Sequence, residues 1–197
     1  MEWITRLMEA LGSPGAGLLV ALENVFPPVP SEVILPLAGF TAGQGKMSLI
    51  AAIVWTTIGS TAGALVLYGL GAWLGLDRLR RLADKIPFVT VSDVDKSDAW
   101  FDKHGSKAVF IGRMVPVVRS LISIPAGVSG MPIMKFTLYT AAGSLVWNSA
   151  LILAGYALGD NYELVDRYLG WLSTAVLAVL AISVAWFVVA RVKERRS

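Results

Sequence analysis

Three long apolar runs dominate the pattern of hydrophobic and polar positions along the chain. Met47–Leu76, Phe136–Gly159 and Tyr168–Ala190 contain no Asp, Glu, Lys, Arg or His. Each run is longer than the roughly 20 residues that cross the hydrocarbon core of a bilayer. We predict three transmembrane helices. Buried helices of a soluble protein are the alternative, but three such runs in so short a chain leave little polar surface to cover them.

Two further segments are apolar but interrupted by prolines and charges. Residues 13–45 and 108–134 contain apolar pieces that are each too short to cross a bilayer alone. Irregular backbone at membrane depth survives only where protein or a water-filled cavity covers it. We expect each segment to form a re-entrant hairpin, which enters and leaves on the same side. The residues expected to shape the turns are Pro27, Pro28, Pro30, Pro116, Pro125, Gly39 and Gly127.

The remaining segments are polar or amphipathic. Residues 1–11 have apolar positions at helical spacing and are expected to lie in the membrane interface, with a frayed tail as the alternative. Residues 77–107 mix seven Lys or Arg with six Asp. The basic residues of this segment and of the C-terminus outnumber Arg6, Lys46 and Arg167, which the layout places on the other side. The positive-inside rule therefore predicts a cytoplasmic C-terminus and a cytoplasmic segment 77–107.

Glycine positions recur weakly along the chain. Gly59, Gly71 and Gly75 match Gly143, Gly155 and Gly159 at an offset of 84 residues. Each repeat would contain one hairpin and one full span, so the second repeat would be inverted relative to the first. The predicted fold is an all-α polytopic membrane protein, a single transmembrane domain over 1–197. It has two inverted repeats, each a re-entrant helical hairpin plus a transmembrane helix, and an extra C-terminal transmembrane helix.

Composition excludes several kinds of chemistry. Of the 197 residues, 55% are hydrophobic and 16% are charged, and there is no cysteine. Disulfides and thiolate catalysis are therefore excluded. The single histidine, His104, lies in a charged segment and cannot form a metal site alone. The net charge of +3 comes from basic residues beside membrane spans, so we expect no nucleic-acid partner. We also expect no metal and no cofactor.

Arg113 and Arg119 are the strongest candidates for function. They flank Pro116 in a stretch apolar enough to enter a bilayer. An arginine at membrane depth costs about 2.5–3.5 kcal/mol on insertion scales. A guanidinium also offers a planar fork of donors that matches phosphate oxygens. We predict that both bind the phosphate of a substrate; snorkelling to the interface is the alternative.

Glu23 and Glu32 lie in a similar proline-broken apolar setting in the first half of the chain. Burial raises the pKa of a carboxylate, whereas a nearby arginine lowers it. The two glutamates are therefore predicted to be charge partners of the arginines and to exchange protons during transport. A static salt bridge is the alternative. Candidate cavity-lining residues in the spans are Thr56, Ser60, Trp147 and Asn148; hydrogen bonding across helices is the alternative role.

These motifs together resemble the DedA family, also called SNARE-associated or VTT-domain membrane proteins. The resemblance lies in Phe26-Pro27-Pro28-Val29-Pro30-Ser31-Glu32 and Gly112-Arg113-Met114-Val115-Pro116-Val117-Val118-Arg119, and covers about residues 12–190. The family usually has Phe where this chain has Met114, and Asn just after the position of Phe136. The resemblance implies paired re-entrant loops and essential residues at the positions of Glu23, Glu32, Arg113 and Arg119.

The resemblance also implies lipid translocation. Bacterial members are linked to recycling of undecaprenyl phosphate and to phosphatidylethanolamine transport, and the proton-motive force is implicated in several. We therefore expect a flippase in the bacterial cytoplasmic membrane, with an anionic lipid and protons as partners. A phospholipid flippase or scramblase, a proton-coupled exporter, a lipid phosphatase and an assembly factor are the alternatives. The oligomeric state stays open, with a homodimer among the choices.

Overall fold

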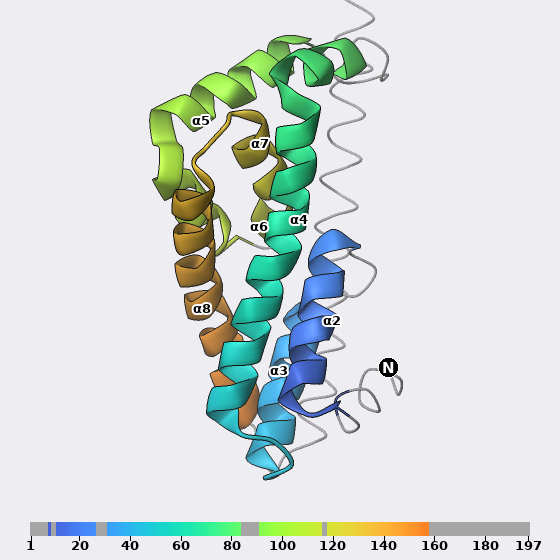
Figure 1. The fold of residues 1–197 in the computed structure, drawn as a ribbon. Coiled ribbons are helices and arrows are strands. Elements are labelled where there is room, and N and C mark those ends of the chain that lie inside the picture. Colours follow the sequence, from blue (N-terminus) through green and yellow to red (C-terminus); the bar gives the residue numbers. More distant parts are fainter. Residues whose placement is uncertain (1–7, 9–10, 27–30, 84–90, 116–117, 158–197) are drawn as a thin grey trace, which may run out of the picture.

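The computed structural model describes residues 8, 11–26, 31–83, 91–115 and 118–157, and the described chain is helical throughout its regular elements (Figure 1). The helices are α2 (Ser13–Val25), α3 (Ser31–Gly43), α4 (Leu49–Ala83), α5 (Val91–Gly112), α6 (Val118–Leu121), α7 (Ser123–Val128) and α8 (Ile133–Ala157). Most of the segment 1–11, the predicted span 168–190, and Pro27, Pro28, Pro30 and Pro116 lie outside the described residues.

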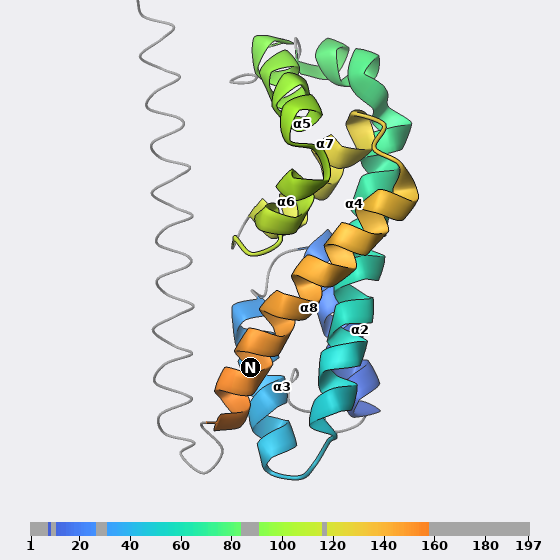
Figure 2. The same ribbon diagram turned by 90° about the vertical axis from the view of Figure 1, so that its left-hand side faces the viewer.

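Helix α4 runs the length of the molecule, and α8 is the second long helix (Figure 1). Residues Leu49–Arg81 of α4 and Ile133–Ala157 of α8 are long and apolar enough to cross a membrane. They correspond to the first two apolar runs of the sequence. Figures 1 and 2 show them crossing, with α4 rising from the end at which α8 finishes. Everything else described packs around this pair.

Helices α2 and α3 form a short antiparallel pair at one end of the molecule. Each has 13 residues, which at 1.5 Å per residue gives about 20 Å. The 35 residues of α4 span about 52 Å by the same rise. Accordingly, α2 rises only to mid-height beside α4, and α3 returns to the end from which α2 started (Figure 1).

At the other end, α5 lies across the molecule and then descends toward its middle (Figure 1). The change of direction falls at Gly105, whose φ of 50° lies in the left-handed region that favours glycine. A similar break in α4 falls at Gly75, with φ 64°, just before the charged residue Asp77. The two glycines thus bend the helices where apolar sequence meets polar sequence.

The short helices pack on the long ones in a crossed arrangement. Helix α3 packs mainly on α8, whereas α7 packs mainly on α4. Glycines make both contacts close: a Cβ on Gly39 would meet the Ile152 carbonyl, and a Cβ on Gly127 would meet the Tyr68 carbonyl. We expected both glycines to shape turns. The structure instead places them inside α3 and α7, where absence of a side chain lets two backbones approach.

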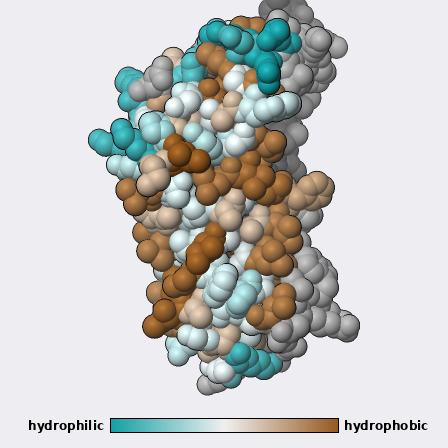
Figure 3. Space-filling model, in the orientation of Figure 1, coloured by the Kyte–Doolittle hydropathy of each residue, from teal (hydrophilic) through white to brown (hydrophobic). Residues whose placement is uncertain are grey.

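The surface is apolar along the shafts of the long helices. Figure 3 shows hydrophobic residues over this face, with hydrophilic residues gathered at the two ends of the molecule. The exposed large side chains include Ile58, Val66, Leu70 and Trp73 of α4 and Leu138, Leu145, Val146 and Leu153 of α8. Exposed apolar area of this extent marks a surface that faces lipid or a partner rather than water.

Candidate functional site

All four charged residues singled out in the sequence are buried at mid-height of the molecule. The exposed fraction is 2% for Arg113, 4% for Arg119, 5% for Glu32 and 7% for Glu23. They come from four places: the end of α2, the start of α3, the turn after α5, and α6. The short helices therefore deliver the charges from both ends of the molecule to one interior region. With two acids and two bases, the set is formally neutral.

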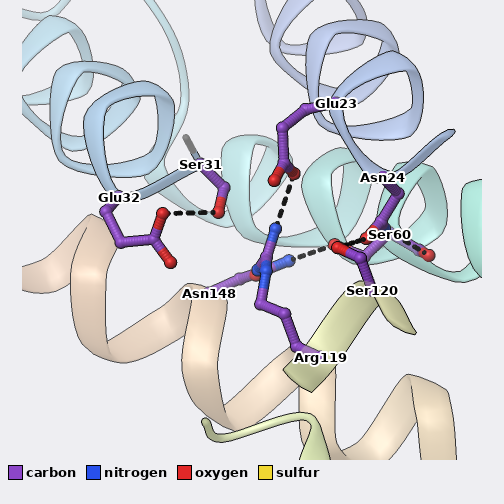
Figure 4. Close-up of polar contacts among 8 residues, drawn as sticks. All are labelled: Glu23, Asn24, Ser31, Glu32, Ser60, Arg119, Ser120 and Asn148. Carbon is purple, nitrogen blue, oxygen red and sulfur yellow. Dashed lines mark hydrogen bonds and ion pairs between the residues drawn. The ribbon is translucent and has the colours of Figure 1, made fainter. Parts of the chain in front are cut away.

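Glu23 and Arg119 form a direct ion pair. The Arg119 Nη2 group donates to Glu23 Oε2 at 2.7 Å, across 96 residues of sequence (Figure 4). Their side chains are only 8% and 5% exposed, respectively. Two charges removed from water in this way stabilise the fold only while they stay together, because each is costly to bury alone.

Arg113 has no carboxylate partner within the described residues. Its Nη2 group donates to the Ser123 hydroxyl at 2.9 Å, and its buried Nε has no hydrogen-bond partner in the described part of the chain. The charges of Arg119 and Glu23 still act on it, so it belongs to the same cluster. Arg113 is thus a buried cation held by one neutral hydroxyl, and it retains unused donor capacity.

Glu32 is the acidic counterpart of Arg113, because it also lacks a partner of opposite charge among the described residues. It lies at the start of α3, and among the described residues its carboxylate accepts one long hydrogen bond of 3.4 Å, from the neighbouring Ser31 hydroxyl (Figure 4). No ion pair joins it to another described residue. The site therefore contains one matched pair, Glu23 with Arg119, and one unmatched acid and base, Glu32 and Arg113.

Amides and hydroxyls connect the charged cluster to the long helices. Asn24 donates to the backbone carbonyl of Ser60 at 2.9 Å and accepts from the Ser120 hydroxyl at 3.0 Å. Asn148 of α8 donates to the Ser60 hydroxyl of α4 at 3.2 Å (Figure 4). This network links α2, α4, α6 and α8, and holds Arg119 in place through its neighbour Ser120.

The structure also places the other residues that the sequence singled out. Ser60 and Asn148 lie beside the charges, whereas Thr56 is one turn away on α4 and bonds the Ala52 carbonyl of its own helix. Trp147 lies on α8 and packs on the core around Ile34 and Ile152. Pro125 lies in the first turn of α7, where a missing N–H breaks no helical hydrogen bond.

Sequence reasoning missed four polar residues at the site: Asn24, Ser31, Ser120 and Ser123. A simple signal marks three of them, because Asn24, Ser31 and Ser120 each adjoin one of the predicted charges. Ser123 carries no comparable signal, since its location depends on how α7 packs.

The arrangement can accept an anion. Arg113 offers unused donors in a buried setting, and the Glu23 carboxylate already occupies Arg119. No group of three or more His, Cys, Asp or Glu in the described residues is placed to hold a metal ion. The chemistry available at this site is therefore that of guanidinium groups, carboxylates, amides and hydroxyls.

The chain matches known proteins over most of its length. The family model described as the VTT domain matches residues 29–157. An alkaline phosphatase-like protein of Lactococcus lactis subsp. cremoris is 40% identical over 92% of this chain and 86% of that protein. Undecaprenyl phosphate transporter A of Staphylococcus aureus is 35% identical over 98% of this chain and 97% of that protein.

A transporter with the same name from Bacillus subtilis is 29% identical over 99% of this chain and 93% of that protein. No solved structure matches the chain significantly. The family match covers more than half of the chain, and it includes Glu32, Arg113 and Arg119. The chain therefore belongs to the VTT-domain family, the DedA membrane proteins that its proline-flanked acids and arginines resemble.

Proposed function

We propose that this protein is a flippase that carries undecaprenyl phosphate across the bacterial cytoplasmic membrane for carrier-lipid recycling. The observation that carries the proposal is Arg113: a guanidinium 2% exposed, bonded to one hydroxyl and to no carboxylate of the described chain. Burial of an unpaired charge is strongly unfavourable. An anionic headgroup that enters the site supplies the missing partner.

Phosphate suits this site better than a carboxylate ligand. A guanidinium makes two parallel hydrogen bonds to phosphate oxygens, which adds geometric specificity to the charge interaction. Arg113 and Arg119 flank Pro116 in the sequence, and both are buried in one cluster. In this proposal the phosphate bridges the two guanidinium groups, while the polyprenyl tail stays in the bilayer.

In this proposal the glutamates couple lipid transport to proton movement. Glu23 already occupies Arg119 at 2.7 Å, so phosphate and Glu23 compete for the same guanidinium. Uptake of a proton by Glu23 removes that competition, and a proton on either Glu23 or Glu32 offsets the negative charge of the headgroup. Release of the proton on the other side restores the ion pair and expels the lipid. A membrane potential adds about 2.3 kcal/mol per charge per 100 mV to such a cycle.

The proposed membrane topology has two related halves. We take α2–α3 and the segment from the descending part of α5 through α7 as re-entrant hairpins that enter from opposite faces of the membrane. The crossed packing of α3 on α8 and α7 on α4 supports two inverted repeats, since each hairpin contacts the long helix of the other repeat. In this proposal segment 77–107 and the C-terminus lie in the cytoplasm, as the positive-inside rule predicts.

The names of two relatives support this cargo. The transporters of S. aureus and B. subtilis are named for undecaprenyl phosphate, and each aligns with nearly the whole chain. A phosphatidylethanolamine-type flippase or scramblase uses the same arginines for a phosphodiester, and headgroup competition separates the two. The name alkaline phosphatase-like of the L. lactis relative indicates a third function. Phosphate release from the lipid by the purified protein tests that function.

The proposal is tested by transport in proteoliposomes. Undecaprenyl phosphate on one leaflet is labelled with a reagent that cannot cross the membrane, in wild type, Arg113→Lys and Arg119→Ala. Arg81→Lys, an exposed arginine at the end of α4, is the matched control. We expect both site variants to lose most of the transport rate and the control to keep it. Wild-type rates in both site variants contradict the proposal.

A further inference from the structure

Two neighbouring side-chain contacts join α2 to α6. The first is the ion pair of Glu23 with Arg119 at 2.7 Å. The second lies one residue further along each helix, where the Ser120 hydroxyl donates to Asn24 Oδ1 at 3.0 Å (Figure 4). Helix α6 has only four residues and lies mainly against α4, α5 and α7, with little other packing on α2. In the described part of the chain, these two contacts are the main direct link between α2 and α6.

The α2 side of this link is fixed to α4. A Cβ on Gly59 of α4 would overlap the Gly17 carbonyl of α2, so the two backbones lie in contact. Gly63, one turn further along α4, leaves room for Asn24, because a Cβ on Gly63 would lie 2.7 Å from the Asn24 Cβ atom. The side chain of Asn24 is consequently 2% exposed. The last turn of α2 is therefore a firm base for the groups that it presents to α6.

The Asn24 amide is oriented by α4. Its Nδ2 group donates to the backbone carbonyl of Ser60 at 2.9 Å, so its Oδ1 atom is the one that faces Ser120. A flipped amide would bring two acceptor oxygens together at Ser60. Ser60 is also tied to α8, because its hydroxyl accepts from Asn148 at 3.2 Å. Asn24 thus presents a fixed acceptor to the hydroxyl of Ser120.

The two contacts respond differently to charge. In the proposed transport cycle, the ion pair opens when a proton neutralises Glu23 or when a phosphate binds Arg119. The contact between Asn24 and Ser120 joins an amide to a hydroxyl, and neither group titrates at physiological pH. Neither event in the cycle therefore removes this hydrogen bond. It can stay closed while the ion pair beside it is open.

We infer that the Asn24–Ser120 hydrogen bond is a neutral latch, which keeps Arg119 in position while the ion pair is open. The inference rests on the proposed function, because that function requires the ion pair to open in each cycle. Asn24 and Ser120 are positioning residues, since they act on the phosphate through Arg119. A closed latch holds the guanidinium at the site for the headgroup, and it returns the same group to Glu23 after the headgroup has left.

The latch is tested by the position of α6 relative to α4. The chain has no cysteine, so spin labels can be attached at two introduced cysteines. Ile50 near the start of α4 is 74% exposed and Leu121 of α6 is 58% exposed. At 1.5 Å per residue, Ile50 lies about 15 Å along α4 from Ser60, which separates the labels enough for measurement. Double electron–electron resonance in nanodiscs then gives the distribution of distances between the labels.

Three variants are compared with the doubly labelled parent. Glu23→Met opens the ion pair with a side chain of similar length, Ser120→Ala opens the latch, and the third variant combines the two. We expect the parent and both single variants to give equally narrow distributions, because one contact still joins α2 to α6. The combined variant should give a broad distribution. Adding Glu23→Met to Ser120→Thr, which keeps the hydroxyl, should leave the distribution narrow.

Transport of undecaprenyl phosphate gives a second measurement. Ser120→Ala should slow transport roughly threefold to tenfold, the loss expected for one hydrogen bond. Ser129→Ala is the matched control, because its hydroxyl bonds the Ala126 carbonyl within its own turn. Ser129→Ala and Ser120→Thr should transport at the wild-type rate. Ser120→Ala should melt at the temperature of Ser129→Ala, because the ion pair still joins the two helices in the ligand-free protein.

A broad distribution in Glu23→Met alone, or a narrow one in the combined variant, overturns the inference. A wild-type transport rate in Ser120→Ala overturns it as well. If Glu23→Met does not fold, as judged by circular dichroism, the same comparisons are made with Glu23→Gln, which removes only the charge. If the distances behave as expected but the wild type moves no undecaprenyl phosphate, the proposed function fails and the latch stands. If the wild type moves the lipid but the distances contradict the latch, only this inference fails.

Discussion

Removal of the Glu23 carboxylate leaves Arg119 buried without its acid. The pair is joined at 2.7 Å, and neither side chain is more than 8% exposed. The Glu23→Gln variant keeps the size and hydrogen-bonding capacity of the side chain but removes its charge. Arg119→Gln removes the opposite charge, and the double variant removes both. The three variants isolate the interaction between the two residues.

The expected magnitude follows from the burial of the pair. Loss of one partner of a buried pair costs about 3–5 kcal/mol, because the remaining charge stays desolvated. For a protein of this size 1 kcal/mol corresponds to about 2–4 °C in melting temperature, so each single variant should melt roughly 6–20 °C lower. The double variant leaves no uncompensated charge and should be more stable than either single variant.

Thermal unfolding in detergent, followed by circular dichroism, measures these differences. The surface pair between Arg80 and Asp95 is the control, with an N–O distance of 2.8 Å and side chains 40% and 47% exposed. Asp95→Asn should leave the melting temperature almost unchanged, since exposed pairs contribute little to stability. If Glu23→Gln costs no more than Asp95→Asn, or if the double variant loses the sum of the two single losses, the pair is not the buried interaction described here.

Three further predictions concern packing. Gly155→Ala should lose about 1–3 kcal/mol of stability, because the new Cβ would meet the Pro36 carbonyl. Gly69→Ala is the control and should gain about 0.5–1 kcal/mol, because a Cβ there meets no atom within 4 Å. Equal melting temperatures of the two variants would argue against the close α3–α8 contact. Gly143→Ala should displace Arg113 and slow transport about tenfold or more, with Gly69→Ala as the control. A wild-type transport rate would show that transport does not depend on the contact between Arg113 and α8. Tyr68→Phe should cost about 1 kcal/mol, since its hydroxyl donates to the Met131 carbonyl, while Tyr139→Phe at the surface should be neutral.

The long helices and the charged residues could be predicted from the sequence because the physics behind them is local. A run without charges that exceeds the bilayer thickness indicates a span wherever it occurs, as for α4 and α8. A charge inside an apolar stretch is costly wherever it occurs, as for Glu23 and Arg113. Both inferences need only the neighbouring residues.

Pairing and packing could not be predicted in the same way. Nothing local indicates that Glu23 binds Arg119 rather than Arg113, since the choice depends on how α2 and α6 meet across 96 residues. The bend at Gly75 was missed because most glycines in apolar helices serve close packing instead. The buried Thr140 hydroxyl, which has no partner among the described residues, was missed because a threonine in a helix normally bonds its own backbone.

The most direct test of the account is an experimental structure of the protein in nanodiscs with undecaprenyl phosphate bound. The account predicts density for the phosphate within hydrogen-bonding distance of the Arg113 and Arg119 guanidinium groups, with the tail leaving between helices into the bilayer. Phosphate density on the surface, with Arg113 and Arg119 both closed onto glutamates and no headgroup in the interior, would contradict it.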